Sequence, residues 1–219
     1  MNEELRRQIQ EELTGKEDAQ VQLQFMSAYA SELEEFLQEM TIAFSKWKEL
    51  DQVVTEDRYT MIVTAYAYGA LHHHLLSMKL LIGGYFVASG NAERYVLECI
   101  ATSILAASDP SLRKRILDGR YTASNSVKHL VRKADRLGLD RKAIERIGKG
   151  IRHYDQLSHP SLLALGTTSV TLGSSSPKTL LGVHYDQGKK KAYDFEVASR
   201  VGIASILPNF IDAIQQVYV

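Results

Sequence analysis

Arg152 and His159 are the two residues of this sequence whose types and spacing best suit chemistry on a phosphate ester. Seven residues carry an α-helix through almost two full turns, so both side chains would lie on one face of a late helix. A guanidinium forms paired hydrogen bonds with phosphate oxygens, and an imidazole exchanges a proton near neutral pH. The pair therefore predicts a site that binds a phosphate and moves a proton beside it.

The residues around this pair support the prediction. Pro160 disfavours helical geometry at His159, so His159 is expected at the helix end, where its side chain can reorient. A helix C-terminus also favours a cationic imidazole. The residues expected to support the pair are the polar members of the same stretch and one i,i+4 ion pair upstream: His153, Tyr154, Asp155, Ser158, Arg94 and Glu98.

A purely structural role is the alternative for the same residues. Arg152 would then pair with a glutamate of the N-terminal helix, and His159 would cap the last helical turn. Arg94 and Glu98, four residues apart on an otherwise apolar helix, would form a buried or half-buried ion pair. The residue types by themselves leave both roles open.

Charge is distributed unevenly along a chain that is neutral as a whole, with 26 basic and 26 acidic residues. Residues 1–57 carry 14 acidic and 5 basic side chains, whereas residues 111–159 carry 13 basic and 5 acidic side chains. Either the acidic region packs against the basic region, or the basic region meets a polyanion.

The elements that would position these residues are mostly helices. A heptad seam from Met26 to Leu50 predicts one long helix, from about Asp18 to Leu50, that packs in a bundle or pairs with another chain. Residues 57–88 form a second long helix that is apolar nearly all round and should lie centrally. Ser89, Gly90 and Asn91 are expected to stop it and to cap the next helix.

Shorter elements follow. Asp109 and Pro110 should start a short helix, the next helix carries a basic stripe, and Asp140 should cap the helix of Arg152. After Pro160 the segments TTSVTLG, TLLGVHY and KAYDFEV alternate and are rich in β-branched and aromatic residues, which predicts a small β-hairpin or meander. A final helix, from about Glu196 to Tyr218, would kink at Pro208.

The predicted fold class is mainly α, a helical bundle with a small C-terminal β-hairpin or meander followed by a final helix. The predicted organisation is a single domain with three parts. Residues 1–57 form an acidic helical segment with the seam, residues 58–165 form the bundle core, and residues 166–219 form the hairpin and the final helix packed on the bundle.

Several common kinds of site are excluded or disfavoured. One cysteine permits no intrachain disulfide and no cysteine-based zinc site. The adjacent histidines 72–74 would point about 100° apart, so they cannot all bind one metal ion. No glycine-rich phosphate loop, nucleophile elbow or HExxH motif is present. We therefore expect no metal and no cofactor.

Localisation is predicted from the same sequence. The charged N-terminus is not typical of a signal peptide. Every apolar run of about 20 residues is interrupted by charged residues or by the histidine cluster. These features predict a cytoplasmic protein without a membrane span.

A helical bundle whose late helix carries Arg, a polar residue and then His after four to six intervening residues resembles the HEPN superfamily. Here the match is Arg152, His153 as the polar follower, and His159 after six intervening residues. The stretches RYVLE and YDQLSHPS also resemble bacterial members, and the likeness covers residues 58–165. Many HEPN proteins are metal-independent RNases of toxin–antitoxin and antiphage systems.

The resemblance implies a metal-free mechanism. His159 would remove the proton from a ribose 2′-OH, and Arg152 would stabilise the charge on the attacked phosphate. The imidazole would be oriented by Tyr154, Asp155 and Ser158. The basic stripe would hold the RNA backbone without reading its sequence, and it consists of Lys128, Arg132 and Arg136.

The rival function is a non-catalytic helical module for protein–protein interaction or dimerisation. In this case the Met26–Leu50 helix would carry the partner, and the two charged regions would set its orientation. We expect a homodimer, because the seam is long and the apolar second helix leaves surplus surface to cover. Whether the protein is an enzyme depends on which of the two functions holds.

Overall fold

The computed structural model describes residues 3, 6, 19–53, 58–159 and 189–218, and the regular secondary structure of these residues is helical throughout. The mainly α part of the predicted fold is confirmed. In chain order the elements are α2 (Ala19–Ala28), α3 (Ala30–Val53), α4 (Arg58–Ile82), α5 (Phe86–Ser108), α6 (Pro110–Leu117), η1 (Ala123–Asn125), α7 (Ser126–Lys133), η2 (Asp135–Leu137), α8 (Arg141–Ser158) and α10 (Lys190–Tyr218).

The predicted C-terminal β-hairpin or meander is wrong, because the described residues contain no strand. Its third segment, residues 191–197, is helical and belongs to α10, while its first two segments lie outside the described residues. Tyr193, Glu196 and Arg200 are buried at helical spacing, whereas Phe195 is 55% exposed. Alternation misled the prediction because charged residues, not apolar ones, occupy part of the buried face of α10.

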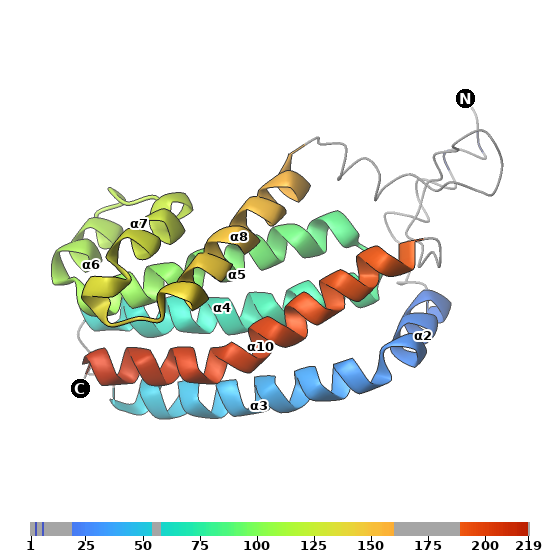
Figure 1. Cartoon of the computed structure of the whole chain (residues 1–219), viewed down its shortest axis with the longest axis horizontal. Coiled ribbons are helices and arrows are strands. Elements are labelled where there is room, and N and C mark those ends of the chain that lie inside the picture. The colour runs from blue at the N-terminus through green and yellow to red at the C-terminus, as the bar shows by residue number, and fades with distance from the viewer. Residues whose placement is uncertain (1–2, 4–5, 7–18, 54–57, 160–188, 219) are drawn as a thin grey trace.

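Helix α5 is the centre of the bundle. It contacts α4, α6, α7, α8 and α10, and most of its residues are buried. Helices α3, α4 and α10 run along it, α8 crosses it, and α6 and α7 cover one end (Figure 1). The central position was predicted for the preceding helix, but α4 exposes Met61, Tyr68, Leu75 and Leu76.

The predicted long helix from Asp18 to Leu50 is broken at Tyr29, so that α2 leaves α3 at an angle (Figure 1). Tyr29 is buried, and its hydroxyl donates a hydrogen bond to Asp194 of α10 over 2.9 Å. Its ring also packs on Phe25, which contacts Tyr193 of α10. The break therefore coincides with the point where this helix is anchored to α10.

The second long helix ends earlier than predicted. Helix α4 stops at Ile82, and Gly84 turns the chain with a φ of 82° that favours glycine. The predicted stop at residues 89–91 lies inside α5. Gly90 instead allows α5 to pack closely against α8.

The heptad seam packs within the chain, as one of its two predicted alternatives required. Helix α3 contacts α10 and α4, and most of the seam is buried against them: Tyr29, Phe36, Met40, Ala43 and Leu50. A protein partner of this helix would have to use its opposite face, where Leu37 is 55% and Ile42 is 46% exposed.

Helix α10 begins before Glu196, contrary to prediction, and Pro208 lies inside it. By length and composition alone it could cross a membrane, a test that core helices of soluble proteins also pass. Half of its most apolar window is buried in the bundle. The expectation of a cytoplasmic protein without a membrane span stays a prediction.

Candidate functional site

Helix α8 carries the Arg152–His159 pair, and two glycines bring it close to α5. A Cβ added at Gly90 would lie 2.5 Å from Cδ1 of Leu157, and one added at Gly150 would lie 2.9 Å from Cδ1 of Leu97. Both distances are too short for real Cβ atoms, so larger residues would push the two helices apart. Asp140 caps α8 as predicted, because its carboxylate accepts a hydrogen bond from the backbone N–H of Lys142.

A cleft of about 620 Å³ lies between α7 and α8, with α5 beneath it. Gly148 lines the cleft, and a Cβ added there would make ordinary contacts with Val131 at 3.6 Å and Arg152 Nη1 at 4.0 Å. Six of the predicted site residues line this cleft: Arg94, Lys128, Arg132, Arg152, Asp155 and His159.

His159 follows the last residue of α8. Its φ of −117° and ψ of 157° are extended, as expected of a residue before proline. His159 and Arg152 are both exposed, and in the part of the chain that the structure describes neither forms an ion pair. The structural alternative, in which Arg152 pairs with a glutamate of the N-terminal helix, is therefore wrong for the described helices.

Arg94 on the floor of the cleft is already neutralised. Its Nε lies 3.3 Å from Glu98 Oε1 and 3.1 Å from Asp155 Oδ1, which links α5 to α8. Burial raises the pKa of Glu98 above its ordinary value, and Asp155 raises it further, against the lowering effect of Arg94. The cations left for an anionic ligand are Lys128, Arg132 and Arg152, because no ion pair within the described residues involves them.

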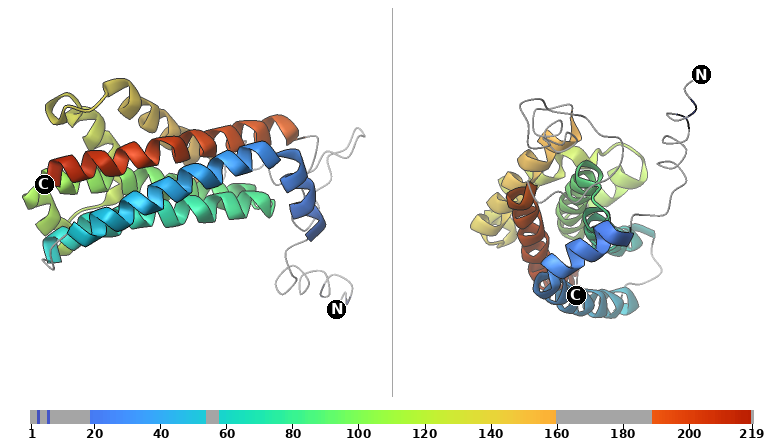
Figure 2. Two further views of the ribbon diagram at one scale, coloured as in Figure 1. Left: turned by 90° about the horizontal axis from the view of Figure 1, so that it is seen from below. Right: turned by 90° about the vertical axis from the view of Figure 1, so that its right-hand side faces the viewer.

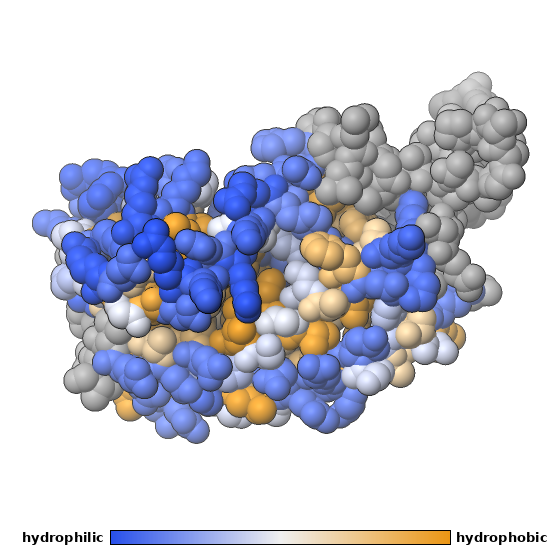
Figure 3. Space-filling view, viewed as in Figure 1, coloured by the Kyte–Doolittle hydropathy of each residue, from blue (hydrophilic) through white to orange (hydrophobic). Residues whose placement is uncertain are grey.

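Within the described residues, acidic α3 packs mainly on α10 and α4 and not on the basic helices α7 and α8. Acidic α3 lies on the opposite side of the bundle from α7 and α8, both in Figure 1 and in the right-hand view of Figure 2. Hydrophilic side chains gather over α6, α7 and α8 (Figure 3). The described part of the acidic region therefore leaves the positive charge around the cleft uncovered, where a polyanion can reach it.

Three predicted supporting residues lie away from the cleft. Tyr154 is two residues from Arg152, which places it on the opposite face of α8, where its buried hydroxyl lies 3.1 Å from Ser199 Oγ. Ser158 donates to the backbone oxygen of Tyr154, and His153 contacts Glu196 of α10. The expectation that Tyr154 and Ser158 orient His159 is wrong, because both are held by other partners.

Arg136 also departs from its predicted place. Helix α7 ends at Lys133, and Arg136 belongs to the separate 3-10 turn η2. The regular four-residue spacing from Lys128 through Arg132 is broken there, so the basic stripe has two members in the cleft instead of three.

A buried cluster of charged side chains, which the sequence reasoning missed, lies in the core beside the cleft. It joins α4, α5 and α10 through His74, Glu93 and Arg200, each of them fully buried, and through Glu196, which is 2% exposed. Nδ1 of His74 lies 3.0 Å from Glu93 Oε2, and its Nε2 lies 3.0 Å from the backbone oxygen of Arg200. Both ring nitrogens therefore have a polar partner in the core.

Arg200 is the hub of this cluster. Its Nη1 donates to Glu196 Oε2 over 2.6 Å, its Nε donates to Ser77 over 2.8 Å, and its Nη2 donates to Ser89 over 2.6 Å. His153 extends the cluster to α8, because its Nε2 lies 2.8 Å from Glu196 Oε1. The cluster thus fixes the helix that carries Arg152 and His159 relative to α10.

The buried carboxylates of the cluster are stabilised in their charged form. Burial alone raises the pKa of Glu93, but His74 and Arg200 outweigh burial and lower this pKa below 4.5. Both carboxylates, Glu93 and Glu196, thus have a positively charged partner in Arg200, as buried charges require. With its core members closed to solvent, this cluster can position helices but cannot receive a substrate.

One sequence signal could have revealed the cluster. Glu196 and Arg200 are four residues apart between apolar residues, the same pattern that singled out Arg94 and Glu98. Glu93 lies on the side of α5 that also buries Val96 and Leu97, so its burial follows from helical spacing once the extent of α5 is known.

The three adjacent histidines have three different environments. His72 is exposed, His73 is half-buried with its Nδ1 3.0 Å from the backbone oxygen of Gly69, and His74 is buried in the core cluster. Among the described residues, no group of three or more His, Cys, Asp or Glu side chains could hold a metal ion.

Comparison of the chain with protein-family models, with curated proteins and with solved structures finds no match. The resemblance to the HEPN superfamily therefore rests on the residues that suggested it.

Proposed function

We propose that the cleft binds the backbone of single-stranded RNA and that the protein cleaves this RNA without a metal ion. The observation that carries the proposal is the presence of Arg152 and His159 in one open cleft, both exposed and without ion-pair partners among the described residues. Lys128 and Arg132 add positive charge along the opposite wall. The HEPN resemblance supports a role in a defence or toxin–antitoxin system.

The proposed reaction begins with neutral His159. Its imidazole takes the proton of a ribose 2′-OH, and the 2′ oxygen forms a bond to the adjacent phosphorus. Arg152 donates hydrogen bonds to the phosphate oxygens as negative charge develops on them. The bond from phosphorus to the 5′ oxygen then breaks, and this oxygen takes a proton from a water molecule in the open cleft. The hydroxide left behind takes the proton from protonated His159, which restores the neutral imidazole. The products are a 2′,3′-cyclic phosphate and a 5′-hydroxyl.

The Arg94–Asp155 ion pair positions the site in this scheme. It joins α5 to the last turns of α8, three residues beyond Arg152 and four before His159. The contact limits the motion of α8 relative to the floor of the cleft, so both reactive side chains approach the same phosphate.

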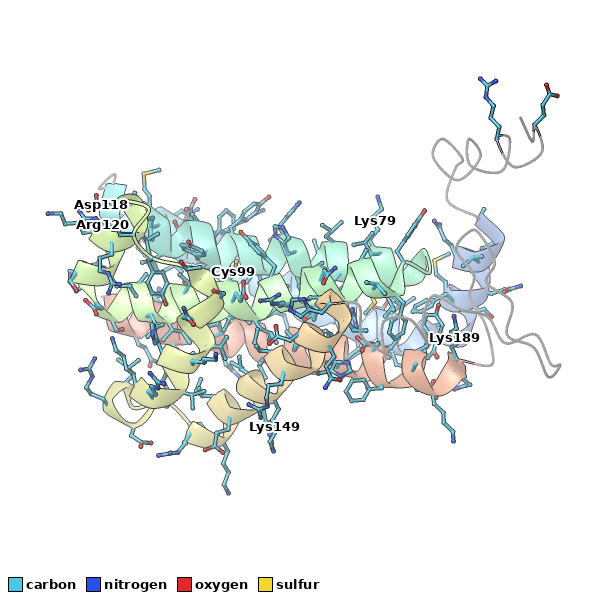
Figure 4. All side chains as sticks on the ribbon, turned by 90° about the horizontal axis from the view of Figure 1, so that it is seen from above. Lys79, Cys99, Asp118, Arg120, Lys149 and Lys189 are labelled. Atoms are coloured by element: carbon cyan, nitrogen blue, oxygen red, sulfur yellow. The ribbon has the colours of Figure 1, made fainter. Side chains whose placement is uncertain are left out.

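Replacing Arg152 with alanine is expected to weaken binding of single-stranded RNA and to make binding less sensitive to salt. Each lost phosphate contact lowers the slope of log affinity against log salt by about 0.7 for single strands. Fluorescence anisotropy with an RNA lacking a free 2′-OH, titrated at several salt concentrations, measures this slope. Lys149→Ala is the matched control, since Lys149 lies on the same helix and points away from α5 (Figure 4). Equal effects of the two substitutions would remove Arg152 from the proposed phosphate site.

A second candidate function, a non-catalytic interaction module, is favoured by apolar side chains exposed on two neighbouring helices. Such side chains on α3 and α4 include Leu37, Ile42 and Met61. The proposed association is a homodimer, because burying such side chains between two copies would remove apolar surface from water.

Sedimentation equilibrium is expected to give the mass of a dimer at roughly tens of micromolar protein. Leu37→Glu should shift the protein toward the monomer, because the dimer would bury an unpaired charge at its interface. Glu39→Lys, a charge change on the same helix, is the control. A wild-type monomer over this concentration range would contradict the proposed homodimer.

A further inference from the structure

A continuous row of aromatic rings crosses three helices on the side of α5 away from α8. The aromatic row consists of Phe44 and Trp47 of α3, Tyr68, His72 and His73 of α4, and Tyr95 of α5. Ring centroids are 4.9 Å apart between Trp47 and Tyr68, 5.8 Å between Tyr68 and His72, and 4.2 Å between His73 and Tyr95. Each ring is therefore supported by a neighbour.

The row is open to solvent although its members are aromatic. Tyr68 and Tyr95 are each 42% exposed, and His72 is exposed as well. The hydrogen-bond contact between His73 Nδ1 and the backbone of Gly69 holds the ring that lies against Tyr95. Partly exposed tyrosine and histidine rings held in a fixed position lose little entropy when a flat ligand stacks on them.

The aromatic row and the proposed RNA cleft meet at α5. Arg94 and Tyr95 are consecutive residues of α5, so their side chains diverge by about 100° around the helix. Arg94 lines the cleft beside α8, and Tyr95 packs on α4. Helices α4, α5 and α8 are seen together from one side of the bundle (Figure 4). Tyr95 is therefore the member of the aromatic row that lies next to the cleft along α5.

We propose that the aromatic row is a platform on which unpaired bases of the cleft-bound strand stack. This inference rests on the proposed RNA cleft and assigns a second part of its binding surface. Stacking on aromatic rings beside a positively charged groove is a general way of holding single-stranded nucleic acid without reading its sequence. The aromatic row lies beside the cationic cleft, and its tyrosine and histidine rings have polar edges. Both features favour a nucleic acid over an apolar partner.

The test compares an oligonucleotide that has bases with one that lacks them. The first is a 2′-O-methyl RNA of about 12 nucleotides, which offers no free 2′-OH, and the second is an abasic strand of the same length. Tyr95→Ala and Tyr68→Ala are each expected to weaken binding of the first strand by about five- to a hundredfold. Binding of the abasic strand should be unchanged, because that strand has only phosphates to offer.

Two variants separate stacking from a general effect on folding. Tyr95→Phe keeps the ring and should bind the base-bearing strand like the wild type. Leu76→Ala, an exposed apolar truncation on α4, should leave both affinities unchanged. Trp47 is the only tryptophan and contacts Tyr68, so its emission should change on binding the base-bearing strand and not the abasic strand.

The outcomes distinguish this inference from the proposed nuclease. If the wild type cleaves no RNA but binds bases through Tyr95, the platform stands and the nuclease proposal fails. If cleavage depends on His159 but the tyrosine variants bind both strands like the wild type, the platform fails alone. Failure of the wild type to prefer the base-bearing strand overturns the platform. The platform is also overturned if Tyr68→Ala changes the sedimentation of the protein but not its binding of the base-bearing strand, since the row would then contact a second copy of the chain.

Discussion

His159→Ala is expected to lower the rate of metal-independent RNA cleavage by about 10²–10⁴-fold, the usual contribution of a positioned general base. The melting temperature should stay nearly the same, because His159 is exposed, lies beyond the last residue of α8 and forms no ion pair in the described structure. Cleavage of a fluorescently labelled single strand in the presence of EDTA measures the rate.

The matched control is His129→Ala. His129 is a half-buried histidine of α7 that contacts Tyr121 and does not line the cleft, so its removal should leave the cleavage rate unchanged. His159 would have a structural role if neither the wild type nor His159→Ala cleaved RNA and the variant also lost several kcal/mol of folding stability. The interaction module would then be the function to pursue.

Arg200→Met is expected to lower the free energy of unfolding by about 3–5 kcal/mol, the typical result of removing one partner from a buried ion network. The guanidinium makes hydrogen bonds to Glu196, Ser77 and Ser89, and all of them are lost together. Methionine fills much of the volume, so the loss reports uncompensated charge more than a cavity. Urea unfolding followed by circular dichroism measures the change.

An exposed arginine provides the control for this substitution. Arg141 pairs with Asp135 and Glu145 at the surface, so Arg141→Met should leave the melting temperature unchanged. Equal destabilisation by the two substitutions, or none by Arg200→Met, would contradict the assignment of Arg200 as the hub of the core cluster.

The same cluster sets an expected pH dependence. Burial raises the pKa of Glu196, but hydrogen bonds and charge from His153 and Arg200 outweigh it and lower the pKa below 4.5, as also holds for Glu93. Carboxylates with a lowered pKa in the folded state stabilise the protein above their unfolded pKa and lose that contribution as the pH falls. In Arg200→Met the uncompensated carboxylates favour protonation, so the variant should be closer to the wild type in acid than at neutral pH.

Local sequence signals determined the helical elements and where several of them begin. Asp109 and Asp140 sit before helices that they cap, and the extended conformation of His159 follows from Pro160. The seven-residue spacing predicted that Arg152 and His159 lie on one side of α8, and both side chains line the same cleft, although His159 itself follows the helix. These features depend on residues close together in the chain, so the sequence alone contains their physical cause.

The positions of helix ends inside apolar segments could not be predicted in this way. Gly90 looks like a helix stop in the sequence, yet it lies within α5. A glycine is needed there because Leu157 of α8 occupies the space where its Cβ would be. The residues now at the start of α10 alternate like a strand, yet Tyr193 and Arg200 show that a helical face is buried there. In both cases the deciding partner is far away in the sequence.

Only the tertiary structure decided which charged residues are buried and which are free. Arg152 and Arg200 are both arginines of helical segments, but Arg200 meets Glu93 and two serines from other helices, while Arg152 faces an open cleft. Sequence spacing orders side chains around one helix axis and cannot say which helix will lie opposite. The packing of α8 and α10 on α5 supplies that information, because it determines which side chains lose water and which remain available to a ligand.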